Sequence, residues 1–211
     1  MYIPAHFRQD NEAELHALMR AQPLATLVTQ SAEGPCANHI PLLLDASGGR
    51  CVLSGHLPRS NSAWKDHPSD APVLTLFHGP QAYVSPSWYA SKAATGRVVP
   101  TWNYTAVHAR GRLRVIDDAA WLRAHLEAIT DSQESRFAHP WKVSDAPADF
   151  TEQLMRGLVG IEIEVTSLEG KWKIGQNRSP EDRAGVAAGL RKLGEASGAH
   201  RMAELMAALE G

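Results

Sequence analysis

Residues 24–56 read LATLVTQSAEGPCANHIPLLLDASGGRCVLSGH. The segment contains three runs rich in Leu, Val, Ile and Thr, over residues 24–30, 35–45 and 50–56. These residue types are enriched in β-strands. The residues between the runs, Ser-Ala-Glu-Gly at 31–34 and Ala-Ser-Gly-Gly at 46–49, are rich in Ser and Gly, which favour turns. Short turns between successive β-runs predict an antiparallel arrangement rather than parallel strands with helical crossovers.

Further β-runs continue this spacing. The sequence predicts strands over residues 72–78, 81–85 (after a break at Gly79-Pro80), 99–116, 159–168 and 171–176. The run 159–168 alternates Ile and Val with polar residues, as a half-buried strand does. Helices are expected over residues 10–21, 60–65, 117–129, 149–156, 179–193 and 200–209, and loops over residues 90–96 and 135–149. The pattern predicts a mainly β protein with added helices, a β-barrel rather than βαβ units.

The composition limits the class of protein. The chain has 211 residues, 44% of them apolar, and a net charge of −2, which suit one globular domain and give no overall positive field to attract nucleic acid. Two cysteines, Cys36 and Cys51, are too few for a disulfide framework and are expected as thiols in a reducing compartment. The N-terminus lacks the pattern of a signal peptide, and no apolar run approaches a membrane span. We therefore expect a soluble, cytoplasmic protein without a membrane partner.

Familiar catalytic and phosphate-binding motifs are missing from the sequence. Neither glycine-rich phosphate loop occurs, nor the Gly-x-Ser-x-Gly elbow of hydrolases, nor His-Glu-x-x-His. The ten histidines are scattered singly, so no metal site is predicted. No catalytic pair can be named, and only His39 and His56 are candidates for proton transfer.

Two polar segments are candidates for binding a ligand. Asn38 and His39 interrupt an apolar strand, where unpaired polar groups would cost about 1–3 kcal/mol each. They either pair across strands or meet the polar edge of a planar ligand, and the residues alone favour pairing. After the next strand, Arg59, Ser60 and Asn61 arrive where a short helix begins. A guanidinium and unpaired N–H groups suit a phosphate, although an ordinary capped helix explains them equally.

Aromatic residues gather beside polar ones at three places. The clusters are Tyr83-Val-Ser-Pro-Ser-Trp-Tyr, Pro100-Thr-Trp-Asn-Tyr and Lys171-Trp-Lys-Ile-Gly-Gln-Asn. Trp and Tyr offer flat apolar faces with a polar handle, which suit ring stacking and subunit contacts. Ordinary core packing is the competing explanation.

These segments together closely resemble the PaiB family, described as FMN-binding negative transcriptional regulators. The resemblance rests on ordered motifs from residue 1 to about residue 190: Met1-Tyr-Ile-Pro-x-His-Phe, Ala37-Asn-His-Ile-Pro, Gly55-His-x-x-Arg-x-Asn, Gly79-Pro-x-Ala-Tyr-Val-Ser-Pro-Ser-Trp-Tyr, Val99-Pro-Thr-Trp-Asn-Tyr, Trp172-Lys-x-x-Gln-Asn-Arg and Glu181-Asp-Arg-x-Gly-Val. In the family a serine usually precedes Gln-Asn, and here Gly175 takes its place.

The resemblance implies an antiparallel FMN-binding split barrel that forms a homodimer with two sites at the interface. It implies a barrel domain over residues 1–178 and a helical extension over 179–211 packed on the same domain. The implied cofactor is FMN, with its phosphate at Arg59, Ser60 and Asn61 and its ring along Asn38, His39 and Ile40. The remaining implied FMN-binding residues, some from the partner chain, are His56, Trp88, Tyr89, Trp102, Asn103, Trp172 and Gln176.

Several functions remain open at this point. The first is a flavin-binding sensor or transcriptional regulator, and the second is an FMN-dependent oxidoreductase that acts on a small molecule. DNA is a further possible partner through the last two helices, but Glu181, Asp182 and Glu204 offset their basic residues. The fourth is a split barrel that holds haem, or a pyridoxal phosphate, with His39, His56, His78 or His108 as the possible iron ligands.

Overall fold

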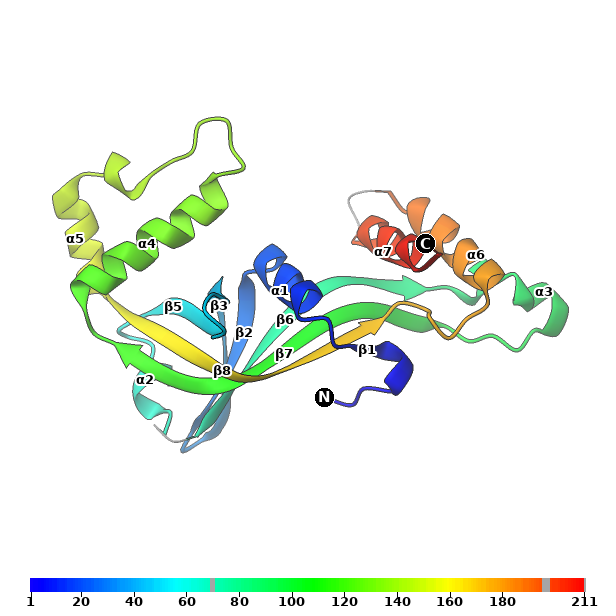
Figure 1. Ribbon diagram of the computed structural model, residues 1–211, viewed down its shortest axis with the longest axis horizontal. Coiled ribbons are helices and arrows are strands. Elements are labelled where there is room, and N and C mark those ends of the chain that lie inside the picture. Colours follow the sequence, from blue (N-terminus) through cyan, green and yellow to red (C-terminus); the bar gives the residue numbers. More distant parts are fainter. Residues whose placement is uncertain (69–70, 195–197, 211) are drawn as a thin grey trace. The chain divides into compact units, whose positions relative to one another are not determined.

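The computed structural model describes residues 1–68, 71–194 and 198–210. Within them, eight strands form one antiparallel sheet in the order β3-β2-β6-β7-β8-β5-β4, and β1 pairs with β8 (Figure 1). The strands are β1 Arg8–Gln9, β2 Leu24–Ser31, β3 Gly34–Pro41, β4 Leu43–Asp45, β5 Val52–Pro58, β6 Pro72–Val84, β7 Thr101–Ile116 and β8 Leu158–Lys173. The predicted antiparallel, mainly β fold is confirmed.

Most of the helices were predicted from capping residues and amphipathic patterns in the sequence. The α-helices are α1 Glu12–Ala21, α2 Ala63–Asp66, α3 Ser91–Thr95, α4 Ala119–Glu134, α5 Ala148–Arg156, α6 Pro180–Arg191 and α7 Ala199–Ala207. Short 3-10 turns cover η1 Ala5–Phe7, η2 Pro86–Trp88, η3 Val143–Asp145 and η4 Ala208–Glu210. Across the described residues, no helix is long and apolar enough to cross a membrane.

The chain forms two compact units. The first, here called the α4 unit, comprises Met19–Phe77 and His108–Leu168. The second, here called the α6 unit, comprises Met1–Leu18, His78–Val107 and Glu169–Gly211. The sequence-based division into a barrel domain, residues 1–178, and a helical extension, residues 179–211, does not coincide with these two units. That division stays a prediction. Of that extension, residues 195–197 and 211 lie outside the described part.

The core of the α4 unit is built by pairing β5 with β8. Leu53 is opposite Ile163, and Leu57 is opposite Val159. All four side chains are buried. Gly55 lies between them because a Cβ there would come within 2.7 Å of a Leu42 methyl. The polar residues of β5, including His56, therefore alternate with a closely packed apolar face.

The core of the α6 unit is built by helix packing. Ser179 caps α6 by accepting from the backbone N–H of Asp182 at 3.3 Å, as the sequence predicted. On α6, Gly189 packs closely against the Trp88 ring. A Cβ at Gly189 would come within 2.4 Å of that ring. Helices α6 and α7 lie side by side in Figure 1 and bury apolar residues that include Leu190 and Met202.

The predicted strand over residues 35–45 is wrong, because the structure divides it at Leu42. That side chain is 2% exposed, and its backbone N–H donates to the Pro23 carbonyl at 2.8 Å. The break lets β3 pair with β2 while β4 pairs with β5. The break was not predicted, because Leu42 lies within the apolar run Leu42-Leu43-Leu44 and its partner Pro23 belongs to a distant segment.

Two predicted strand ends are also wrong. Strand β6 continues through Gly79-Pro80, and β8 continues through Gly170. A Cβ at Gly79 would lie 2.1 Å from the Thr105 hydroxyl, and one at Gly170 would lie 2.3 Å from a Leu15 methyl. These glycines therefore allow close packing against a neighbour and do not form turns.

Residues 91–95, expected as a loop, form α3. The Asp182 carboxylate accepts from the Ser91 backbone N–H at 2.9 Å and from the Ser91 hydroxyl at 2.8 Å. Gly96 follows with φ 64° and ends the helix in the left-handed conformation. A distant carboxylate thus fixes a segment whose own composition resembles a loop.

Candidate functional site

Strand β3 presents an exposed surface in the α4 unit. It stands at one end of the sheet order, and of its eight residues only Ile40 is buried. The free edge of a sheet carries unpaired N–H and C=O groups, which can pair with another chain unless a helix or loop covers them. This surface is therefore a natural place for a binding partner.

The structure brings together two of the predicted FMN-binding residues on this surface. The Asn61 side-chain amide donates to the Asn38 side-chain carbonyl at 2.7 Å. The Asn61 side-chain carbonyl in turn accepts from the Ala63 backbone N–H at 3.0 Å, which fixes the start of α2. The two amides come from β3 and from the segment after β5, so their contact joins the predicted ring and phosphate segments.

The neighbouring candidates differ in their surroundings. The His39 ring is exposed and its Nδ1 lies 3.0 Å from the Thr26 hydroxyl on β2. Cross-strand pairing, the simpler of the two readings of this segment, thus holds for His39. Ile40 is buried beneath the strand, and Ser60 is exposed beside Arg59.

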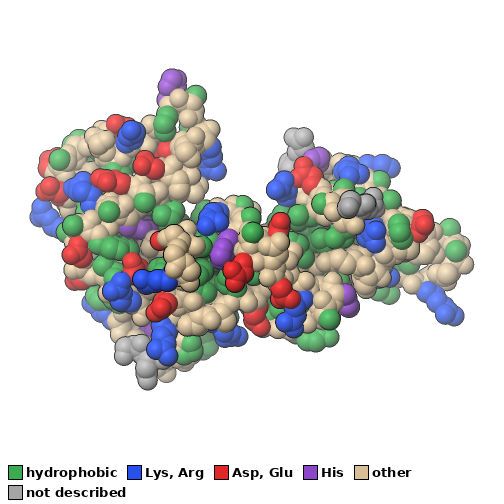
Figure 2. Space-filling model, in the orientation of Figure 1, with side chains coloured by type: hydrophobic (Ala, Val, Ile, Leu, Met, Phe, Trp, Pro, Cys, Tyr) green, Lys and Arg blue, Asp and Glu red, His purple; other side chains and the backbone are tan. Residues whose placement is uncertain are grey.

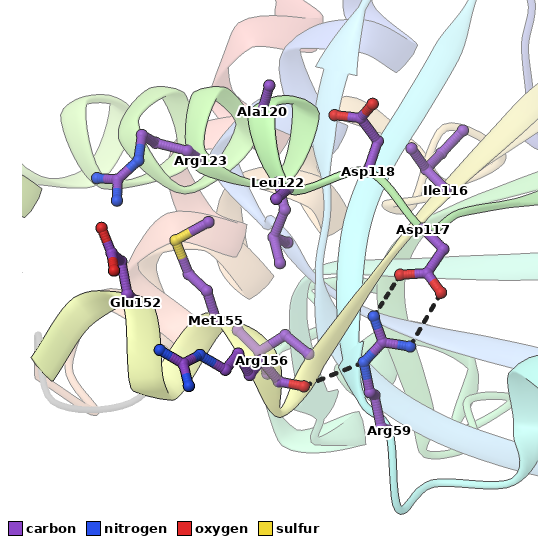
Figure 3. A pocket seen from close by; sticks show the side chains of 12 residues that line it. Arg59, Ile116, Asp117, Asp118, Ala120, Leu122, Arg123, Glu152, Met155 and Arg156 are labelled. Carbon is purple, nitrogen blue, oxygen red and sulfur yellow. Dashed lines mark hydrogen bonds and ion pairs between the residues drawn. The ribbon is translucent and has the colours of Figure 1, made fainter. Parts of the chain in front are cut away.

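Arg59 is held by groups that the sequence did not indicate. Its Nη1 donates to the Asp117 carboxylate at 3.1 Å, its Nη2 pairs with the other Asp117 oxygen, and its Nε donates to the Arg156 carbonyl at 3.1 Å (Figure 3). The hydrogen bond to Arg59 lowers the pKa of Asp117, and the same bond raises the pKa of Arg59. Arg59 remains a cation whose direction is set by a carboxylate at the end of β7.

A cavity of about 530 Å³ opens beside this ion pair in the α4 unit. Its lining is largely apolar, with Leu122 of α4 and Met155 of α5 facing it in Figure 3. Charged side chains also line it, among them Arg59, Arg123 and Glu152. Its volume lies within the range of small-molecule sites, about 300–1,000 Å³.

His56 has a partner that sequence analysis missed. Its Nδ1 lies 3.2 Å from Nε2 of His125 on α4, whose ring stacks on Trp121 with 5.1 Å between centroids. Burial lowers the pKa of His56, and burial together with the nearby His56 lowers the pKa of His125 to about 4. The pair is therefore uncharged at neutral pH. The only hint in the sequence was a polar residue on the inner face of a capped helix.

The other candidates lie in the α6 unit. Tyr89 is 5% exposed and lies beneath Arg178, whose guanidinium carbon is 4.9 Å from the ring centroid. Asn103 is 3% exposed, and among the residues that the structure describes its amide donates to the Met206 sulfur alone, at 3.5 Å. Trp102 is 54% exposed, with Tyr83 edge-on to its ring.

The last two candidates have local structural contacts. Trp172 is 8% exposed, and its carbonyl accepts from the Gln176 amide. The Gln176 side-chain carbonyl accepts from the Ile174 backbone N–H at 3.0 Å. Gln176 thus closes the turn after β8, in which Gly175 has φ 88°.

The comparisons with known proteins bear on this arrangement. A family model described as "Putative FMN-binding domain" matches residues 1–167. The chain belongs to this FMN-binding family. It is also 31% identical to the Bacillus subtilis protein named "Protease synthase and sporulation protein PAI 2", over 98% of this chain and 96% of that protein. The resemblance to the PaiB family is thereby confirmed.

Solved structures confirm the split-barrel fold expected of an FMN-binding family member. The FAD- and haem-binding protein of Mycobacterium smegmatis superposes with a TM-score of 0.60 at 17% identity, over 86% of this chain and 80% of that one. The flavocytochrome Anf3 of Azotobacter vinelandii superposes with a TM-score of 0.58 at 14% identity, over 87% and 78% of the two chains. At these identities the likeness concerns the fold alone.

FMN is the cofactor of the family, and the donors in the α4 unit suit its phosphate. A guanidinium carries five N–H donors. Asp117 and Arg156 occupy three of those of Arg59, and the side chain is 38% exposed. Two N–H donors therefore remain for an anionic ligand, and the hydroxyl of Ser60 and the amide of Asn61 follow Arg59 in the chain. This donor set fits a phosphate ester.

Proposed function

We propose that this FMN-binding family member works as a homodimer that holds FMN over β3 and the β5–α2 connection, as a flavin-dependent sensor in transcriptional regulation. Arg59, Ser60 and Asn61 would hold the phosphate, and Asn38, His39 and Ile40 would lie along the ring. The Asn38–Asn61 contact carries this proposal, because it places amides from both predicted segments on one exposed surface.

The exposed edge strand β3 supports the homodimer. A flat ring needs two faces of contact, and a single copy offers one exposed strand. The exposed Trp102, which also belongs to the proposed pocket, is of a type enriched in subunit interfaces. FMN itself, when bound, supplies hydride or electron transfer, while these residues bind and orient it.

The test is a titration of FMN into the purified full-length chain, followed by flavin fluorescence and by mass from light scattering. We expect a dimer that binds one FMN per chain, and an affinity loss of at least tenfold in Asn61→Ala. Gln30→Ala, which removes another exposed amide of the α4 unit, should bind like the wild type. A protein that leaves the fluorescence of saturating FMN unchanged, or that stays monomeric while binding it, contradicts the proposal.

Direct DNA binding by α6 and α7 has weaker support. Arg183 donates to the Arg178 carbonyl at 3.2 Å, and Arg201 donates to Glu204 at 2.7 Å. The other helical part shows no continuous basic surface on the face drawn in Figure 2, because basic and acidic side chains are interspersed where α4 and α5 lie. If the chain does not bind DNA itself, it would regulate transcription through a partner protein that responds to the bound flavin. A mobility-shift assay at low and moderate salt tests this, since complexes specific for a sequence survive salt that removes non-specific ones.

An oxidoreductase is the second candidate, and the histidine pair favours it. Burial keeps His56 uncharged at neutral pH, so it can accept a proton beside the proposed flavin segment. Consumption of NADH or NADPH by the FMN-loaded protein tests this function. If the protein consumes NADH or NADPH no faster than free FMN does, the oxidoreductase function is excluded and the sensor function remains.

A further inference from the structure

The α6 unit contains a small cavity whose lining is rich in cations. Its volume is about 140 Å³, and its polar lining includes Lys173 at the end of β8, Arg178 in the following turn, Arg183 on α6 and Asn103 on β7. Pockets for whole drug-sized ligands span about 300–1,000 Å³. The cavity therefore has room for one functional group rather than for a flavin ring.

Like charges are crowded at this cavity. Burial lowers the pKa of Lys173, and the positive charges of Lys171 and Arg178 lower it further. Lys171 is 8% exposed and lies against the Tyr104 ring. Bringing such groups together without an anion is unfavourable in a partly buried place.

The acidic groups near the cavity form no direct ion pair with these cations in the described part of the chain. Asp182 lines the cavity, but both of its oxygens accept hydrogen bonds from Ser91. Glu181 is exposed in the first turn of α6. Within the described ranges, no carboxylate lies at ion-pair distance from Lys173, Arg178 or Arg183.

Several N–H donors of the cavity residues also lack a strong acceptor. The Nε of Arg183 is fully buried and has no hydrogen-bond partner among the described residues. The buried Asn103 amide has only the Met206 sulfur, a weak acceptor. Lys173 donates to the Thr101 hydroxyl and to the Trp102 carbonyl, which leaves one of its three N–H groups for a ligand. Unpaired buried donors destabilise a fold, and an acceptor in the cavity would satisfy them.

We propose that this cavity binds a single oxyanion group, a phosphate or a carboxylate of a small molecule other than the flavin, through Lys173, Arg178, Arg183 and Asn103. The site stands on the α6 unit alone and does not rest on the proposed flavin site.

The test is calorimetric titration of inorganic phosphate, and separately of acetate, into the FMN-free full-length chain at fixed ionic strength. We expect at least one of the two anions to saturate one site per chain. Arg183→Met and Lys173→Met should weaken that binding at least tenfold. Arg191→Met removes an exposed cation from the same helix and should change it less than twofold.

A second variant covers the risk that Lys173→Met fails to fold, since it loses two hydrogen bonds. Arg178→Met removes a guanidinium that contacts the Tyr89 ring. This variant should bind the anion tenfold more weakly and keep the wild-type melting temperature. The proposal is overturned if neither anion saturates, or if Arg191→Met weakens binding as much as Arg183→Met. It is also overturned if saturating FMN abolishes anion binding, because the cavity would then belong to the flavin. FMN affinity is measured separately, so failure of either proposal is recognised by itself.

Discussion

His56 Nδ1 and His125 Nε2 lie 3.2 Å apart, so one imidazole donates its proton to the other. The hydrogen bond excludes a positive charge on both rings at once, because a proton on each facing nitrogen would bring two donors together. Burial lowers the pKa of both rings, so both are uncharged at neutral pH. The stacked Trp121 ring and the sheet exclude water from His125, which is 5% exposed. The pair thus links α4 to β5 through a bond that depends on pH.

Acidification should destabilise the protein through this pair. The pKa of His125 is about 4 in the folded chain against 6.5 ordinarily. Between these values the unfolded chain binds the proton and the folded chain does not. The stabilisation is therefore complete above pH 6.5 and is lost as the pH falls toward 4. From pH 7 to pH 5 we expect a loss of about 2 kcal/mol in the free energy of unfolding, measured in urea.

His125→Leu should remove this part of the pH dependence and leave the stability less sensitive between pH 7 and pH 5. His139→Leu, at an exposed histidine of the same unit, is the control and should keep the wild-type slope. An unchanged slope in His125→Leu would show that other groups cause the acid sensitivity.

Asp117 should compete with FMN for Arg59. Its carboxylate occupies both Nη groups of the guanidinium, the groups that a phosphate would engage. Asp117→Asn should therefore tighten FMN binding about three- to tenfold, while stability changes by less than about 1 kcal/mol because the pair is exposed. Fluorescence titration measures the affinity, and Asp131→Asn on the exposed side of α4 is the matched control. Weaker binding in Asp117→Asn would mean that Asp117 positions Arg59 instead.

Local signals predicted most of the elements but few of their limits. Ser179 and Pro180 start α6, and alternation marks the first part of β8, because these signals are contained in neighbouring residues. The break at Leu42 and the continuation through Gly79 depend on residues far along the chain. A single sequence does not show those neighbours, so a glycine that allows close packing resembles one that forms a turn.

The candidate site divides in the same way. The contact between Asn38 and Asn61 agrees with motifs that could be recognised in the sequence. The partners Asp117 and His125 lie 58 and 69 positions from Arg59 and His56, and only the folded sheet brings them close. No local pattern distinguishes them from other surface carboxylates or helical histidines.

Two tryptophans of the proposed pocket should respond differently to truncation. Trp102 is 54% exposed, so Trp102→Ala should change the melting temperature little. The same variant should lower the affinity for FMN at least tenfold. Trp88 is half-buried and fills the space over Gly189, so Trp88→Ala should cost about 2–3 kcal/mol of stability, less than a fully buried aromatic. Thermal melting and fluorescence titration of both variants separate binding from packing. Unaltered FMN affinity in Trp102→Ala would remove Trp102 from the pocket.

Gly175 stands where the resemblance to the PaiB family implies a serine, and the backbone explains the glycine here. Its φ is 88°, in the region that side chains with a Cβ avoid, and a Cβ would lie 3.4 Å from the Met206 methyl. Gly175→Ser should therefore lower the free energy of unfolding by about 1–2 kcal/mol. Ala184→Ser, at an exposed position of α6, should cost less than half as much. Urea denaturation of both variants decides, and a Gly175→Ser protein as stable as the wild type would show that this turn adopts another conformation.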